Sequence, residues 1–99
     1  MKLIFEWDAS KARINLAKHQ VSFEEARTLL NDPLLLTVID DFHSKDEGRF
    51  ISIGLSVRGR ILLLIHTERY ETEDSLVIRI ISCRKATKSE RITYEDGQK

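Results

Sequence analysis

The chain has few of the residues that most often build special sites. Its 99 residues include one cysteine, one proline and four glycines, and 16 lysines and arginines balance 16 aspartates and glutamates. A single cysteine cannot form an internal disulfide, which fits a reducing cytoplasm. A formal net charge of zero excludes a protein that binds nucleic acid through its overall charge, as histones do. Any nucleic-acid site therefore depends on charge that is segregated along the chain.

Long apolar runs are also missing. The longest aliphatic run, residues 61–65, is far too short to span a bilayer, and no apolar signal-peptide region follows Met1 and Lys2. We therefore expect a soluble protein that is neither membrane-bound nor exported. The length and the 41% hydrophobic content predict one domain over residues 1–99, with a tail that frays over about residues 95–99.

Helix signals occur near both ends of the chain. Asp8 can cap a first helix that ends near His19, with an apolar stripe of Ala9, Ala12 and Leu16. A capping box, in which Ser or Thr precedes Glu by three residues, predicts the start of a second helix and of a short C-terminal helix that ends near residue 94. The two boxes are Ser22 with Glu25 and Thr87 with Glu90.

Strand signals fill the rest of the chain. Alternating or continuous apolar runs predict strands over residues 3–7, 34–39, 50–57, 61–67 and 76–83. Arg58-Gly59 predicts a tight hairpin between the third and the fourth strand. The resulting order is βααββββα, an α+β domain with two N-terminal helices packed on a mostly antiparallel sheet and a short C-terminal helix.

Positive charge gathers at the end of the last strand. Residues 79–91 hold five cations against one anion, and Arg79 lies inside a β-branched strand, where an unpaired charge is costly. Guanidinium groups in such a cluster suit phosphate. Regular alternation places Arg79 and Arg84 on opposite faces, with Ser82 opposite Arg79. The two arginines can converge only if the strand bends near residues 82–83.

Motifs spread over residues 4–94 together resemble the BrnT family of small toxins from bacterial type II toxin–antitoxin pairs, which have a RelE-like fold. The motifs are Phe5-Glu6-Trp7-Asp8, Lys11, Asn15, Lys18-His19, Val21-Ser22-Phe23-Glu24-Glu25-Ala26, Asp32-Pro33, Glu47-Gly48-Arg49-Phe50, Ile53-Gly54, His66-Thr67 and Ile80-Ile81-Ser82-Cys83-Arg84-Lys85-Ala86-Thr87. Cys83 and Lys85 stand where the family commonly has Ala and Arg.

The resemblance implies a cytoplasmic ribonuclease that inhibits translation. The resemblance also implies neutralisation by a BrnA-type antitoxin that has a ribbon-helix-helix DNA-binding region. The toxin would then bind DNA only indirectly, through the antitoxin. The sequence leaves open whether the toxin forms a dimer within that complex. Neither a cofactor nor a metal is expected.

A metal-free ribonuclease needs a base for the ribose 2′-OH, cations for the charge of the transition state, and an acid for the leaving oxygen. We predict that the catalytic residues are His66, Glu68, Arg79 and Arg84, with the histidine as proton carrier at the end of the central strand. We predict that further residues bind RNA, namely Lys11, His19, Lys88, Arg91 and Tyr94.

Each of these residues also has a purely structural interpretation. His66 can be a hydrogen-bonded histidine of the sheet, Glu68 a solvated carboxylate, and either arginine half of a salt bridge. The lysines and Arg91 can lie on solvated faces, and His19 can interact with the dipole of its helix. Tyr94 can pack against the sheet.

Two other functions remain open at this stage. An acidic loop with Asp40, Asp41, His43, Asp46 and Glu47 allows a metal site, but its spacing matches no established metal motif. The chain could also be a non-catalytic module that binds the antitoxin and acts as a repressor subunit. Tight antitoxin binding without growth arrest would distinguish that module from a ribonuclease.

Overall fold

The computed structural model describes residues 1–41 and 48–97. Its elements are β1 (Lys2–Glu6), α1 (Ala9–His19), α2 (Phe23–Arg27), the 3-10 helix η1 (Thr28–Asn31), β2 (Leu36–Ile39), β3 (Arg49–Leu55), β4 (Ile61–Thr72), β5 (Ser75–Lys85) and α3 (Lys88–Asp96). The strands form one sheet in the order β1-β5-β4-β3-β2, in which β1 and β5 are parallel and the other neighbours antiparallel. The predicted α+β class is confirmed.

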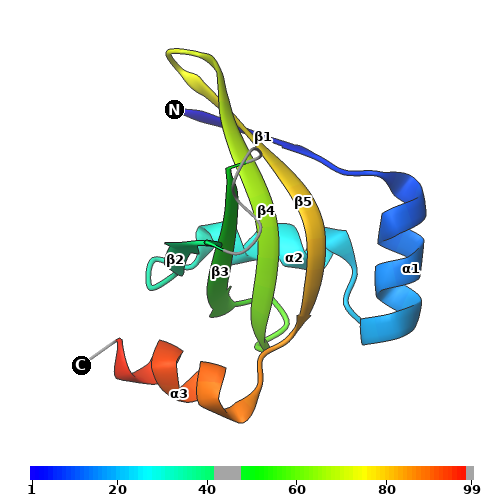
Figure 1. Ribbon diagram of the computed structural model, residues 1–99, viewed down its shortest axis with the longest axis vertical. Helices are drawn as coiled ribbons and strands as arrows, with labels where there is room; N and C mark the ends of the chain where they lie inside the picture. The colour runs from blue at the N-terminus through cyan, green and yellow to red at the C-terminus, as the bar shows by residue number, and fades with distance from the viewer. Residues whose placement is uncertain (42–47, 98–99) are drawn as a thin grey trace.

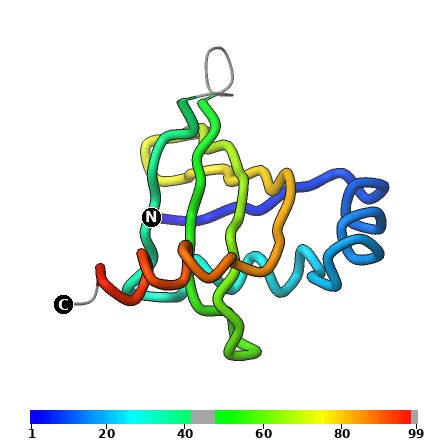
Figure 2. Tube along the Cα trace, turned by 60° about the horizontal axis from the view of Figure 1, so that its bottom comes forward, coloured from blue at the N-terminus to red at the C-terminus, as the bar shows by residue number. Residues whose placement is uncertain are grey.

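The two faces of the sheet have different surroundings. In Figure 1, α2 lies behind the sheet and α1 stands beside the β5 edge. We call the face against α2 and η1 the covered face and the opposite one the open face. Figure 2 shows that α3 lies across one end of the sheet. Most of the open face therefore has no helix over it among the described residues.

The hydrophobic core lies on the covered face. Leu62 and Leu64 of β4 are fully buried against side chains from the α1–α2 connection, α2 and η1, together with Ile80 and Cys83 of β5. Burying an aliphatic side chain of this size contributes about 1.5–3 kcal/mol. The helices around α2 thus hold the middle of the sheet, and β4 is its central strand as predicted.

Local sequence signals account for the helix starts. Asp8 Oδ1 accepts a hydrogen bond from the Lys11 N–H at 3.0 Å, and Ser22 Oγ accepts one from the Glu25 N–H at 3.0 Å. At α3 the capping box is complete, because Thr87 and Glu90 satisfy each other's backbone N–H groups. The helix then continues to Asp96, two residues beyond its predicted end.

The predicted apolar stripe of α1 is wrong in one important respect. Leu16 is 51% exposed, whereas Asn15, a polar residue of the same helix, is buried. Asn15 Nδ2 donates to the carbonyl oxygens of Val21 and Cys83, and Asn15 Oδ1 accepts from the Cys83 N–H at 3.0 Å. Because β1 pairs with β5 only as far as Arg79, this side chain takes the place of a neighbouring strand further along β5.

A β-bulge in β5 changes which side chains share a face. Ile65 pairs with Ser82 and His66 with Ile80, so Ile81 is an extra residue without its own partner on β4. Arg79 pairs with Thr67 and Arg84 with Leu63, and these two partners are four residues apart on one regular strand. Both arginines and Ser82 therefore lie on the open face, which corrects the regular alternation expected from sequence.

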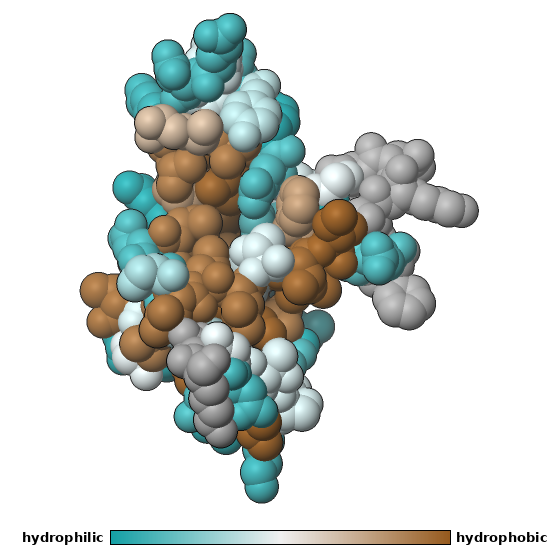
Figure 3. All heavy atoms as spheres, turned by 90° about the vertical axis from the view of Figure 1, so that its left-hand side faces the viewer, coloured by the Kyte–Doolittle hydropathy of each residue, from teal (hydrophilic) through white to brown (hydrophobic). Residues whose placement is uncertain are grey.

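The β2 side of the molecule is apolar. β2 is an edge strand, and its Val38 and Ile39 side chains are each 60% exposed. Figure 3 shows apolar side chains gathered over this side. Over residues 1–41 and 48–97, the helices are all too short or too polar to cross a membrane.

Candidate functional site

A pocket of about 390 Å³ opens on the open face between the sheet and α3. Its floor is aliphatic, from Ile51, Leu63, Ile65 and Ile81. Its rim is polar and charged, and consists of Asp40, Arg49, Ser82, Arg84 and Glu90. The pocket thus combines an apolar surface with cations that can bind an anionic group.

Arg84 is held in place by the first turn of α3. Its Nη1 and Nη2 atoms donate to Glu90 Oε1 and Oε2 at 2.8 and 3.0 Å, a two-pronged pair. The hydrogen bonds from Arg84 lower the pKa of Glu90 to about 2, assisted by the backbone N–H of Thr87. The guanidinium side chain remains 38% exposed, so an incoming phosphate can reach it.

A second group of cations lies further along the same face. Arg49, Thr67, Arg79 and Glu6 form one row across β3, β4, β5 and β1. Arg79 Nη1 lies 3.0 Å from Glu6 Oε2, and Arg69 donates two hydrogen bonds of 3.2 Å to the same carboxylate. Hydrogen bonds from Arg69, and next from Arg79, keep the pKa of Glu6 below its ordinary value. One glutamate thus holds two arginines.

The two predicted catalytic arginines are brought to one face but not into one cluster. The β4 partners of Arg79 and Arg84 are four residues apart, which corresponds to roughly 13 Å at about 3.3 Å per residue. Each arginine is oriented by its own glutamate. This separation suits the binding of two successive phosphates, or of a phosphate and a neighbouring group. It does not suit the binding of one phosphate oxygen by both arginines.

The other two predicted catalytic residues lie on the covered face. His66 is fully buried, accepts or donates a 2.7 Å hydrogen bond with Ser52 Oγ, and stacks against Phe50. Burial lowers the pKa of His66 to about 4. Glu68 is half-buried, with Oε2 3.6 Å from His66 Nδ1, and burial raises its pKa. His66 therefore does not stand at an open mouth of the sheet, and this geometry favours its structural interpretation.

The predicted RNA-binding residues divide between two places. Lys11 and His19 line a second pocket of about 180 Å³ between α1 and β5, together with Lys18. Lys88 and Arg91 are exposed on α3. Tyr94 is buried, and its hydroxyl donates to Asp32 Oδ2 at 2.6 Å, so its ring packs on the fold rather than presenting a stacking surface.

Sequence reasoning missed three polar members of the open-face pocket, namely Arg49, Ser82 and Glu90, of which Glu90 was predicted only as a cap of α3. Arg49 begins β3 and Ser82 follows the bulge, and neither could be assigned to this face without the strand register. The sequence places Asp40 only in the acidic loop that allows a metal site. Of that loop, residues 42–47 lie outside the described residues, and the described part of the chain has no group of three metal-ligating side chains.

The family comparison and the structural comparison both match BrnT proteins. A model of the family described as "Ribonuclease toxin, BrnT, of type II toxin-antitoxin system" matches residues 7–90. The crystal structure of the Brucella abortus ribonuclease toxin BrnT has a similar fold, with a TM-score of 0.59 and 22% identity over 89% of this chain and 100% of that one. Comparison with curated proteins gave no match. Because the family model spans most of its length, the chain belongs to the BrnT family of type II toxin–antitoxin ribonuclease toxins.

Proposed function

We propose that this toxin is a metal-independent endoribonuclease that cleaves RNA by attack of the ribose 2′-OH and so inhibits translation in the cytoplasm. The observation that carries the proposal is the bulge at Ile81, which places Arg79 and Arg84 on the open face together with Arg49. Fixed guanidinium groups beside a pocket can stabilise the charge that develops on the phosphate. Membership of the family supports the toxin role.

Arg84 and Glu90 would act together in this chemistry. The Glu90 carboxylate is ionised at neutral pH and sits in the pocket rim, but its pKa of about 2 makes it a weak base while Arg84 is bound to it. An RNA phosphate that competes for Arg84 weakens that pair, so the pKa of Glu90 rises toward its ordinary value. Glu90 then becomes a better acceptor for the 2′-OH proton.

His66 and Glu68 remain alternative proton carriers in this proposal. Their use would require the covered face to open, because His66 has no exposed surface. Lys88 and Arg91 on α3 would contribute RNA contacts next to the pocket, whereas the buried ring of Tyr94 would support α3 from beneath.

The antitoxin partner is proposed to be of the BrnA type, with a ribbon-helix-helix region that contacts DNA for both proteins. Its toxin-binding segment would cover the open face and so block the pocket. We propose that two toxin chains are held together in the complex through the antitoxin.

The test is incubation of the purified, antitoxin-free protein with a defined single-stranded RNA in excess EDTA, with analysis of the fragment ends. We expect 2′,3′-cyclic phosphate ends, and a loss of about 100-fold or more in cleavage rate for Arg84→Ala, the size typical for removal of a group that stabilises transition-state charge. Arg79→Ala should also lower the rate.

Arg58→Ala is the matched control. Arg58 also faces a glutamate, at 3.7 Å from Glu25 Oε1, but lies on the β3–β4 turn, outside the pocket. An equal loss in this control, or cleavage that requires a divalent ion, would contradict the proposal. A folded protein that leaves free and ribosome-bound RNA intact while binding the antitoxin tightly would instead indicate the non-catalytic module.

A further inference from the structure

The open-face pocket does not end at the edge of the sheet. Ile81 and Ser82 line both this pocket and the smaller one between α1 and β5. The two depressions are therefore neighbours that meet at the bulge. β1 stops pairing with β5 at Arg79, so no strand separates them at this point.

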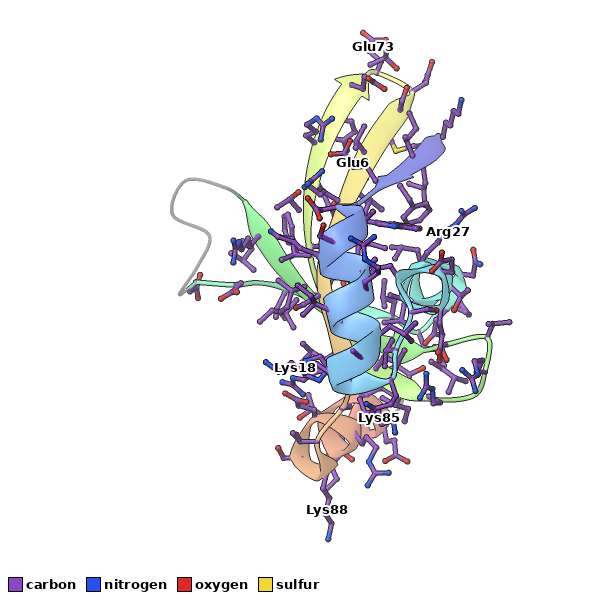
Figure 4. All side chains as sticks on the ribbon, turned by 90° about the vertical axis from the view of Figure 1, so that its right-hand side faces the viewer. Glu6, Lys18, Arg27, Glu73, Lys85 and Lys88 are labelled. Atoms are coloured by element: carbon purple, nitrogen blue, oxygen red, sulfur yellow. The ribbon has the colours of Figure 1, made fainter. Side chains whose placement is uncertain are left out.

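Cations follow the second pocket along α1. Lys11 and Lys18 are seven residues apart and line the same pocket, which places them roughly 10 Å apart along the helix. Figure 4 shows Lys18 near the end of α1, on the side toward the β2–β3 hairpin and hence toward the open face. Arg13, on the same helix, lines a different pocket beside α2.

Charge differs between the two depressions. The rim of the open-face pocket contains two arginines and two carboxylates, those of Asp40 and Glu90, whereas the described lining of the α1 pocket contains Lys11, Lys18 and His19 and no carboxylate. The α1 pocket therefore has the larger excess of positive charge at neutral pH. It is suited to binding phosphate, while the open-face pocket holds the groups suited to chemistry.

We propose that the two pockets form one continuous track for the backbone of single-stranded RNA, which crosses the β5 edge at the Ile81–Ser82 bulge. This inference rests on the proposed ribonuclease function and adds the form of the substrate. A flexible single strand can turn around a sheet edge between two small depressions, whereas a rigid A-form duplex cannot follow that path. Lys11 and Lys18 bind phosphates on one side of the bulge, and Arg84 binds on the other.

The test of the track measures the affinity of the protein for a fluorescein-labelled RNA oligonucleotide that carries a 2′-O-methyl group on every sugar. Fluorescence anisotropy gives Kd in EDTA over a range of NaCl concentrations. This probe cannot undergo 2′-OH attack, so the result does not depend on cleavage. We expect Lys11→Gln/Lys18→Gln to raise Kd about tenfold or more. The slope of log Kd against log salt should fall by about 1.4, as expected when two phosphate contacts to a single strand are lost.

Matched variants separate the track from general electrostatics. Arg13→Gln/Arg58→Gln removes the same charge from α1 and from the β3–β4 turn but leaves both pockets intact, so Kd should change less than twofold. Lys11→Arg/Lys18→Arg should restore binding. Both lysines are exposed, which leaves the fold of these variants intact, as circular dichroism would verify.

Three results would overturn the track: an unchanged Kd for the double lysine variant, an equal rise in Kd for the Arg13 and Arg58 control, or equally tight binding of a duplex of the same sequence. Failure of the proposed ribonuclease activity looks different, since the probe would still bind and respond to the lysines while cleavable RNA stays intact. In cleavage assays, the lysine variants should raise KM and leave kcat within about twofold, whereas Arg84→Ala should lower kcat.

Discussion

Polar side chains on the two faces of the sheet differ in burial and in the kind of partner they bind. On the covered face, His66 is buried and bonded to Ser52, and Asn15 is likewise buried at the β5 edge and bonded to Cys83. On the open face, Arg79 and Arg84 are about 40% exposed and bonded to glutamates that are themselves accessible. Exposed ion pairs contribute little to stability, but buried groups are costly to leave without a partner. The covered face therefore holds the fold, and the open face is free to exchange its internal partners for a ligand.

Deletion of Ile81 together with Ser82 would break this division of roles most severely. With both residues removed, Arg79 and Arg84 are three positions apart on a regular strand, so one of the two arginines must turn toward the core. We expect the free energy of unfolding to fall by about 4 kcal/mol or more, because that arginine would be buried without its glutamate. Urea denaturation followed by circular dichroism measures this change.

Deletion of Ile81 alone is the control for that double deletion. It leaves Arg79 and Arg84 four positions apart, so regular alternation keeps both on the open face, and it should cost much less. Equal losses in the two variants would mean that shortening β5, and not the face that each arginine occupies, sets the cost.

Acid should destabilise the covered face through His66. The ordinary histidine pKa is 6.5, and burial lowers the pKa of His66 to about 4. Between these values the unfolded chain binds a proton that the folded protein does not, so the free energy of unfolding falls as the pH drops from 6.5 to 4. The total loss from this residue is about 3 kcal/mol.

His66→Gln isolates this contribution. Gln can still bond to Ser52 Oγ but does not titrate, so the difference in unfolding free energy between wild type and variant should shrink as the pH falls from 6.5 to 4. A constant difference over this range would show that His66 is accessible to protons in the folded protein. That outcome would support His66 as a proton carrier in the reaction.

The smallest change in stability is expected for Glu90→Gln on the open face. Gln can retain the capping box with Thr87, and the lost ion pair with Arg84 is partly exposed, so the cost should be below about 1 kcal/mol. Cleavage should nevertheless fall about 100-fold if Glu90 accepts the 2′-OH proton. Glu24→Gln, at an exposed position of α2, should change neither quantity, and a Glu90 variant with full activity would remove this residue from the mechanism.

Local signals in the sequence predicted much of the fold. Asp8, Ser22 and Thr87 each cap a helix start by bonding to a residue three positions on, a relation that can be read directly from the chain. The role of Asn15 could not be predicted, because its partner Cys83 is 68 residues away. The bulge depends on the register between β4 and β5, which alternation alone does not define. The site on the open face follows from that register. The arginines of the site could therefore be identified from the sequence, but that they share one face could not.

The contact between Asn15 and Cys83 has a consequence for self-association. The side-chain amide offers β5 one donor and one acceptor, as a peptide group of an adjoining strand would, and so occupies the part of the β5 edge that β1 leaves unpaired. At the opposite edge, β2 exposes Val38 and Ile39 and contains no lysine, proline or glycine. The other edge strand, β1, carries the charged residues Lys2 and Glu6, so any fibril or misassembled species of this toxin should grow from β2, and charged substitutions there would suppress it.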